Sequence, residues 1–195
     1  RHQAFVPSAE QVIRVNGGQH GLLCVLMALL KPGDTLVTEQ LTYPGLISVA
    51  RMLGIKLIGV GMDDEGLLPE SLSEVCQHHR VSAVYCTPTL QNPTAAVMSV
   101  PRREAIAEVC RQHNLLIIED EAHAVLAQQR PLPLSHFAPE RSVLIGSLSK
   151  AVSAGLRAGY LHAPQPLIGR LSAAVRGTCW MASPLSMELA TAWIE

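Results

Sequence analysis

The sequence predicts an α/β fold in which a mainly parallel sheet is covered by helices on both faces. Apolar runs of strand length alternate with helix-length amphipathic segments along the chain, which is the pattern of consecutive strand–helix–strand units. The chain has 195 residues, of which 48% are hydrophobic and 16% charged, so it can bury one substantial core. We therefore expect one globular domain without internal repeats.

Seven segments have the length and apolar character of strands. The run at 115–118 consists only of leucine and isoleucine, which is typical of a strand buried on both faces in the middle of a parallel sheet. The run at 55–60 is bounded by glycines. In chain order, the predicted strands are 12–15, 35–38, 55–60, 81–86, 115–118, 142–145 and 159–161.

Helical apolar patterns lie between most of these strands. Pro69 and Pro101 suit the first turn of a helix, and Gly54 suits the end of one. A long irregular stretch containing three prolines separates the fifth strand from the sixth. The predicted helices are 19–30, about 45–53, 69–79 and 101–113, and a further apolar helical pattern runs from 185 to the end.

Composition argues against several classes of protein. A formal net charge of -1 with scattered arginines provides no basic face for a phosphate backbone, so we expect no nucleic-acid binding by this segment alone. Every apolar run is shorter than the ~20 residues that a bilayer requires, so we expect no membrane span and take the cytoplasm as the default location. The five cysteines are odd in number and lack a CxxC pair, which favours reduced structural thiols over a metal site.

Polar segments follow four of the predicted strands, where ligands of open α/β sheets bind. The first is Gly17-Gly18 before a helix, which turns free backbone N–H groups and the positive helix end toward an anion. An ordinary strand-to-helix turn is the alternative. This segment lacks the lysine of a triphosphate loop and the third glycine of a dinucleotide motif. A smaller phosphorylated cofactor therefore fits better.

Lys150 and Asp120 indicate which chemical groups that cofactor carries. The chain has only three lysines, and Lys150 alone follows a buried strand through small hydroxyl residues. An amine there would lose water and favour the neutral form that a carbonyl captures; a surface lysine is the alternative. Asp120 ends an apolar strand, where a buried carboxylate needs a positive partner such as a protonated pyridine nitrogen. The alternative is an aspartate that caps the following turn.

These features belong to an ordered set of motifs, listed here in chain order: Pro32-Gly33-Asp34, Thr42-Tyr43-Pro44-Gly45, Asn92-Pro93-Thr94, Ile118-Glu119-Asp120, and Ser147-Leu148-Ser149-Lys150 followed by Gly155-Leu156-Arg157-Ala158-Gly159-Tyr160. The set resembles the fold-type I pyridoxal-5′-phosphate (PLP) enzymes of the aminotransferase class I/II superfamily. Within it, the chain looks most like the aminotransferase-like domain of MocR-type regulators of the GntR group. The resemblance covers nearly the whole chain from Ile13 and implies a three-layer α/β/α fold with a mainly parallel seven-stranded sheet.

The resemblance also implies roles for individual residues. Lys150 would hold PLP as a Schiff base, and Asp120 would pair with the ring nitrogen; these are the two predicted catalytic residues. Tyr43 would stack on the ring, and Asn92 would bind the ring hydroxyl oxygen. The residues that would hold the phosphate are Gly17, Gly18 and Gln19 through their backbone, with Ser147, Ser149 and Arg157.

Some positions depart from the family pattern. Ala95 replaces a glycine, Ala154 replaces a proline, and the tyrosine that usually follows the aspartate is missing, with Ala122 and His123 in its neighbourhood. His123 could donate to the ring oxygen, or it could be an exposed or packing histidine. These departures leave PLP binding intact and argue against efficient transamination.

Two functions follow from the resemblance. One is the effector-sensing domain of a transcriptional regulator, which binds PLP and an amino acid or amine and reports to an N-terminal winged helix-turn-helix domain. The other is an active aminotransferase; another PLP reaction, such as β-elimination or retro-aldol cleavage, is a weaker option. The chain lacks an initiator Met at Arg1-His2-Gln3 and stops inside a helical pattern. We therefore expect residues 1–195 to be a PLP-binding large domain truncated at both ends, without the C-terminal small domain, and expect a homodimer.

Overall fold

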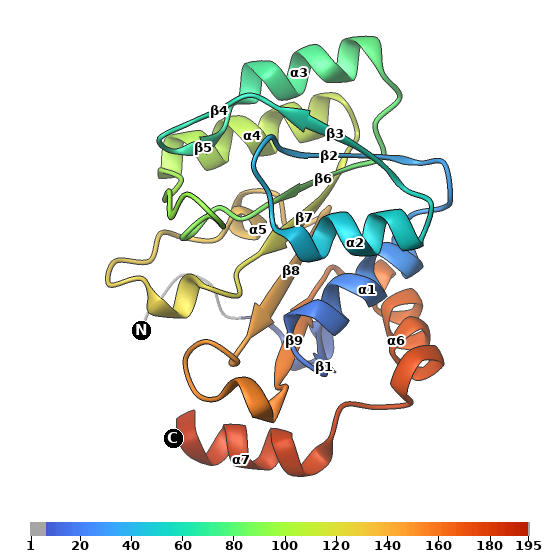
Figure 1. The fold of residues 1–195 in the computed structure, drawn as a ribbon, viewed down its shortest axis with the longest axis vertical. Helices are drawn as coiled ribbons and strands as arrows, with labels where there is room; N and C mark the ends of the chain where they lie inside the picture. The colour runs from blue at the N-terminus through green and yellow to red at the C-terminus, as the bar shows by residue number, and fades with distance from the viewer. Residues whose placement is uncertain (1–6, 195) are drawn as a thin grey trace.

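The computed structural model describes residues 7–194. The features noted at residues 1–3 and at residue 195 lie outside the described residues. A seven-stranded sheet forms the middle of the molecule, with the strand order β1-β9-β8-β7-β6-β2-β3 (Figure 1). β9 is antiparallel to both of its neighbours, and the other pairs are parallel. The strands are β1 Val12–Val15, β2 Thr35–Glu39, β3 Lys56–Val60, β6 Ala83–Cys86, β7 Leu116–Asp120, β8 Ser142–Ser147 and β9 Gly159–His162.

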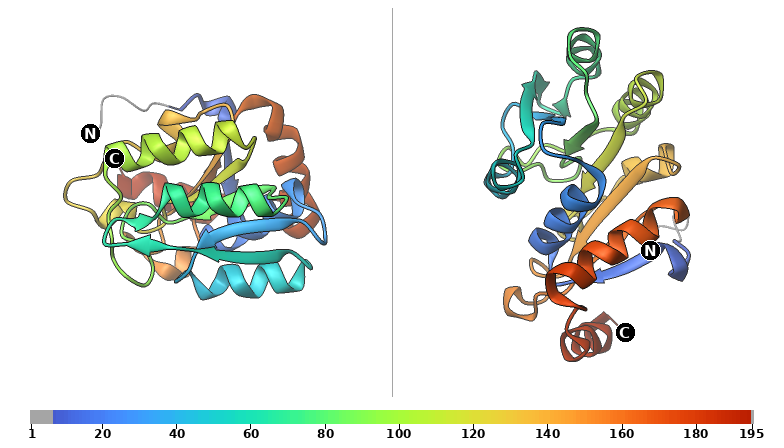
Figure 2. Two further views of the ribbon diagram at one scale, coloured as in Figure 1. Left: turned by 90° about the horizontal axis from the view of Figure 1, so that it is seen from above. Right: turned by 90° about the vertical axis from the view of Figure 1, so that its right-hand side faces the viewer.

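Helices cover both faces of the sheet (Figure 2). One face packs against α1 (Gly18–Leu29), α2 (Pro44–Met52) and α6 (Gln165–Cys179). The other packs against α3 (Pro69–His78), α4 (Val100–Gln112) and α5 (Leu134–Phe137). Each face has its own apolar core, which confirms the predicted three-layer α/β/α fold. The last helix, α7 (Pro184–Ile194), lies at one end of the molecule.

The structure adds elements that the sequence analysis left out. The proline-containing stretch before β8 is not wholly irregular, because it holds α5 and a short 3-10 helix, Ala124–Leu126. A two-stranded hairpin, β4 (Met62–Asp63) with β5 (Gly66–Leu67), precedes α3. α6 was also not predicted, although Leu167, Leu171 and Val175 recur at helical spacing.

Two further observations concern the described residues. None of the helices within 7–194 is both long enough and apolar enough to cross a membrane. All five cysteines are free thiols, and Cys24, Cys86 and Cys110 are buried, as expected for structural thiols.

Candidate cofactor site

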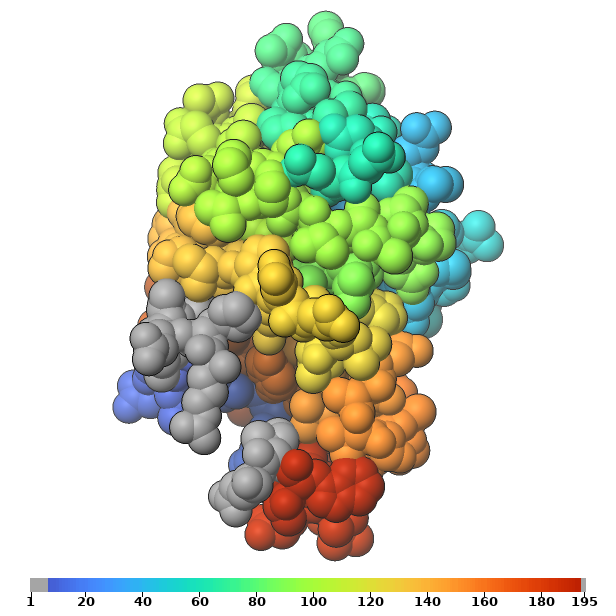
Figure 3. All heavy atoms as spheres, turned by 90° about the vertical axis from the view of Figure 1, so that its left-hand side faces the viewer, coloured from blue at the N-terminus to red at the C-terminus, as the bar shows by residue number. Residues whose placement is uncertain are grey.

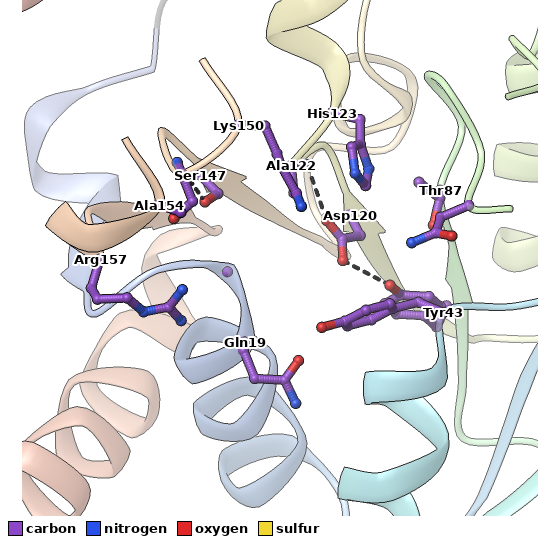
Figure 4. Close-up of a pocket in the computed structure, with 14 residues that line it drawn as sticks. Gln19, Tyr43, Thr87, Asp120, Ala122, His123, Ser147, Lys150, Ala154 and Arg157 are labelled. Carbon is purple, nitrogen blue, oxygen red and sulfur yellow. Dashed lines mark hydrogen bonds between the residues drawn. The ribbon is translucent and has the colours of Figure 1, made fainter. Parts of the chain in front are cut away.

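A cavity of about 180 Å³ opens at the carboxyl edge of the sheet (Figure 4). β1, β2, β6, β7 and β8 all run in the same direction, so the segments that follow them meet at this edge. Ten of the eleven predicted site residues line the cavity, and Gly17 lies just outside the lining. The lining residues are Gly18, Gln19, Tyr43, Tyr85, Thr87, Asn92, Asp120, Ala122, His123, Ser147, Ser149, Lys150, Ala154 and Arg157.

The start of α1 is open toward the cavity. Gly17 is its N-cap residue with φ +80°, a backbone conformation that glycine adopts without strain, and no side chain caps the helix. A Cβ atom at position 17 would lie 3.0 Å from Nη2 of Arg157, so the missing side chain lets this guanidinium come close to the helix end. Backbone N–H groups and a cation therefore converge on one spot, which suits an anion.

Two serines extend this anion-binding edge. Ser147 is the last residue of β8, and its Oγ accepts a hydrogen bond from the backbone N–H of Ser149 at 3.2 Å. The Oγ of Ser149 is buried and has no hydrogen-bond partner. A buried hydroxyl without a partner is costly, so this atom is a ready contact for a ligand oxygen.

Asp120 is the only carboxylate of the Glu119-Asp120-Glu121 run that lines the cavity. Side chains alternate between the two faces of a strand, so Glu119 and Glu121 point to the opposite face, where Arg103 of α4 lies 3.6 and 3.7 Å from their carboxylates. Within 7–194, no lysine, arginine or histidine forms an ion pair with Asp120.

Two donors hold the Asp120 carboxylate in place. The hydroxyl of Tyr85 donates to Oδ2 at 2.7 Å, and the backbone N–H of Ala122 donates to Oδ1 at 3.0 Å. Burial raises the pKa of Asp120, and the bond from Tyr85 opposes that rise. Asp120 therefore caps a local turn, as the alternative interpretation predicted, and also faces the cavity.

Lys150 departs from one expectation. Its side chain extends into the cavity on the side where Asp120 lies (Figure 4), but it is exposed to solvent. The prediction of a desolvated amine is therefore wrong for this chain. The physical reason is that Lys150 lies beyond the end of β8, at the rim of an open cavity, where nothing in residues 7–194 covers it.

The remaining predicted residues also line the cavity. Tyr43 follows β2 as the N-cap residue of α2, and Gln19 lies next to it on α1. Asn92 belongs to the loop after β6, which the side chain of Gln91 braces by donating to the Leu41 carbonyl at 2.6 Å and accepting from the N–H of Thr94 at 2.8 Å. His123 also lines the cavity, half-buried and within electrostatic range of Asp120.

Sequence reasoning missed four lining residues: Tyr85, Thr87, Ala122 and Ala154. Tyr85 is the most informative, because it is fully buried inside a strand and bonds to Asp120. A phenol hydroxyl in the otherwise apolar run at 83–86 was the available signal, since a buried tyrosine hydroxyl normally finds a partner.

The residues present fit PLP on three observations. The uncapped helix start, the orphaned Ser149 hydroxyl and Arg157 match a phosphate. A buried carboxylate without a cation matches a protonated ring nitrogen. A primary amine reaches the same cavity and matches an aldehyde.

Fold and cavity together define the large domain of a PLP-dependent transferase. A family model described as aminotransferase class I and II matches residues 2–195. The chain belongs to this family, and membership implies PLP as the cofactor.

Individual proteins and a solved structure are also similar to this chain in sequence or fold. The chain is 35% identical over 186 residues to an uncharacterized HTH-type transcriptional regulator, YdeF, of Bacillus subtilis, covering 95% of this chain and 40% of that protein. It is 34% identical over 174 residues to an aromatic amino acid aminotransferase of Schizosaccharomyces pombe, covering 75% and 36%. The crystal structure of the α-aminoadipate aminotransferase LysN of Thermus thermophilus, complexed with N-(5′-phosphopyridoxyl)-L-leucine, superposes with a TM-score of 0.90 at 27% identity, covering 95% and 49%. The chain thus spans less than half the length of each of these proteins.

Proposed function

We propose that this chain is the effector-sensing, PLP-binding large domain of a transcriptional regulator, with the cofactor held through a Schiff base to Lys150. The observation that carries the proposal is that one cavity combines the Lys150 amine, a buried carboxylate without a cation and an uncapped helix start. The domain would span 1–195 as part of a longer protein.

The phosphate would lie at the start of α1. The backbone N–H groups of Gly18 and Gln19, the hydroxyls of Ser147 and Ser149, and the guanidinium of Arg157 would hold it, with Gly17 supplying the turn. About four charge-assisted hydrogen bonds at ~1.5–3 kcal/mol each give ~6–12 kcal/mol before ordering costs. That is enough to retain the cofactor without the covalent link.

The ring would lie between Tyr43 and the carboxyl ends of β6 and β7. Tyr43 would stack on it, Asn92 would donate to its hydroxyl oxygen, with His123 as a second donor, and Asp120 would keep a proton on its nitrogen. When bound, PLP supplies an aldehyde that condenses with amines and a ring that draws electrons from the amine's α-carbon. Lys150, once displaced by an incoming amine, can accept or return a proton at that carbon.

A regulatory role is supported by the relatives and by the departures from the family pattern. Three Bacillus subtilis relatives, each 34–36% identical, are described as HTH-type transcriptional regulators. Ala95, Ala122 and His123 stand where residues of the catalytic pattern are expected. DNA would be bound by a separate N-terminal domain, and the effector would be an amino acid or amine.

An active aminotransferase is the second candidate, favoured by the 34% identity to the Schizosaccharomyces pombe aminotransferase. The full-length protein, loaded with PLP, should be mixed with a single amino acid and a 2-oxo acid acceptor while its absorption spectrum and the amino acid formed from the acceptor are followed. A regulator is expected to change its spectrum without sustained turnover and to change its DNA affinity. Steady transfer of the amino group to a 2-oxo acid would instead establish the enzyme.

Cofactor attachment has its own test. The purified full-length protein should show the visible absorbance of a PLP Schiff base, and borohydride should fix the cofactor to Lys150. Lys150→Ala should abolish both, whereas Lys56→Ala, at the opposite edge of the sheet, should change neither. Schiff-base absorbance that survives in Lys150→Ala would refute the proposal.

We also propose a homodimer. Large apolar side chains are exposed just after α6 and along α7, and α7 is the red segment at one end of the molecule in Figure 3. Exposed apolar patches of this kind favour a protein partner. Sedimentation of the full-length protein tests this; a monomer at micromolar concentration would contradict it. The exposed residues are Trp180, Met181, Leu185, Leu189 and Trp193.

A further inference from the structure

Tyr85 makes a direct contact to the proposed ring-binding carboxylate from a neighbouring strand. Its side chain is fully buried, and its hydroxyl lies 2.7 Å from Oδ2 of Asp120. The two residues are 35 positions apart in sequence. The β6–β7 register places Tyr85 beside Ile118, and Asp120 shares a face with Ile118 because side chains alternate along a strand. The phenol therefore reaches forward along the sheet to the carboxylate.

The direction of this hydrogen bond is set by the chemistry. Burial and the nearby carboxylate raise the pKa of Tyr85 well above its usual value, so the phenol keeps its proton and donates it. Burial also raises the pKa of Asp120, which favours the protonated, neutral carboxyl, and the Tyr85 bond works against that shift. Tyr85 thus favours the charged form of a carboxylate that forms no ion pair within 7–194.

Asp120 has room for a third partner. An ionised carboxylate offers about four lone-pair sites, and Tyr85 and the Ala122 backbone N–H use one on each oxygen. Both donors belong to the protein framework, so they orient the carboxylate plane before any ligand arrives. A remaining lone pair is free to accept a ring N–H.

We propose that Tyr85 is a positioning residue which holds Asp120 ionised and oriented, so that the proton shared between Asp120 and a bound pyridine ring resides on the ring nitrogen. The inference rests on the proposed PLP site and adds a residue from β6 to it. Without the Tyr85 hydroxyl, the carboxylate becomes more basic. The shared proton then moves toward Asp120, and the ring becomes a weaker electron sink.

The test uses the full-length protein loaded with PLP labelled with ¹⁵N in the ring. Tyr85→Phe should move the ring ¹⁵N resonance toward that of unprotonated pyridine. It should also weaken PLP binding by about tenfold, the size expected for a lost hydrogen bond to a charged group. Tyr160→Phe is the control, because Tyr160 is a half-buried tyrosine that lies outside the cavity; it should leave the resonance unchanged.

Two further variants separate this role from simple packing. Replacing Tyr85 by 3-fluorotyrosine preserves the ring and strengthens the donor, so the resonance should move in the opposite direction. In an Asp120→Asn background, Tyr85→Phe should add no further shift, because the pair acts as one unit. An unchanged resonance in Tyr85→Phe or in the fluorotyrosine protein would overturn the inference. Wild-type protein that forms no Schiff base would instead refute the proposed function itself.

Discussion

Gly45 lies against the ring of Tyr43. A Cβ atom at position 45 would be 2.3 Å from Cε1 of Tyr43 and 2.5 Å from Oε1 of Gln19, distances at which atoms overlap. The Tyr43 ring can occupy its place beside the cavity only because residue 45 has no side chain. Gly45 does not line the cavity, but it determines where the ring of Tyr43, which does line it, can lie.

Gly45→Ala should therefore weaken PLP binding by about tenfold, because the displaced Tyr43 ring loses its stacking position, a contact of about 1 kcal/mol or more. The free energy of unfolding of the apo protein should fall by much less than the free energy of PLP binding, because alanine favours a helix over glycine by about 1 kcal/mol. Gly177→Ala is the control: it lies on α6 with nothing within 4 Å of its Cβ position. Fluorescence titration with PLP gives the affinities, and equal affinities of the two variants would contradict the prediction.

Arg157 should matter only for ligands that carry a phosphate. Arg157→Gln removes the cation beside Gly17 and should weaken PLP binding at least tenfold, as expected for a charge-assisted contact of about 1.5–3 kcal/mol. Binding of pyridoxal, which has no phosphate, should be unchanged. Arg176→Gln, on the exposed side of α6, serves as the control. A loss of pyridoxal affinity equal to the loss for PLP would show a structural effect instead.

Glu39 should make stability depend on pH. Burial raises its pKa from 4.5 to about 7, so the folded state binds a proton more tightly than the unfolded state. The contribution of this proton binding to the free energy of unfolding is complete below pH 4.5 and is lost as the pH rises through 7. The loss between pH 5 and 8 is about 2–3 kcal/mol. Glu39→Gln should therefore gain stability relative to wild type over that interval in urea unfolding. Glu74→Gln, on an exposed surface, should track wild type; a constant difference for Glu39→Gln would contradict the assignment.

Arg103 should be critical for stability rather than for cofactor chemistry. It is fully buried on α4, near Glu119 and Glu121, and donates to the carbonyls of Pro88 and Met98. Arg103→Met should lower the free energy of unfolding by about 3–5 kcal/mol, because it leaves the buried Glu119 carboxylate without a cation, whereas Glu121 keeps Arg130 at 3.2 Å. Arg111 lies on the same helix, and Arg111→Met, which breaks its exposed pairs with Glu108 and Glu140, should cost about 1 kcal/mol or less. Similar midpoints for the two variants in urea unfolding would argue against a buried ion network.

Much of the fold was accessible from sequence because the signals are local. Alternating apolar runs predicted all seven strands of the main sheet, and Pro69 and Gly54 indicated helix boundaries within a residue or two. The rule that ligands bind beyond strand carboxyl ends gathered distant segments into one site. From the sequence alone, this rule predicts Asp120 and Ser147 at the same edge of the sheet.

Other features could not be predicted because they depend on strand order, register and packing. The Tyr85–Asp120 bond requires β6 and β7 to be neighbours in one register. The exposure of Lys150 depends on what covers the cavity mouth, and no local pattern encodes that. The contact between Gly45 and Tyr43 depends on the angle at which α2 leaves β2.

The sequence by itself therefore determined the fold class, the family and the segments that form the cofactor cavity, because periodicity and turn chemistry act over a few neighbouring residues. Only the tertiary structure decided which side chains touch. Contacts such as that of Arg157 with the Asn16 carbonyl join residues 141 positions apart in the chain, and they form only once the sheet has assembled.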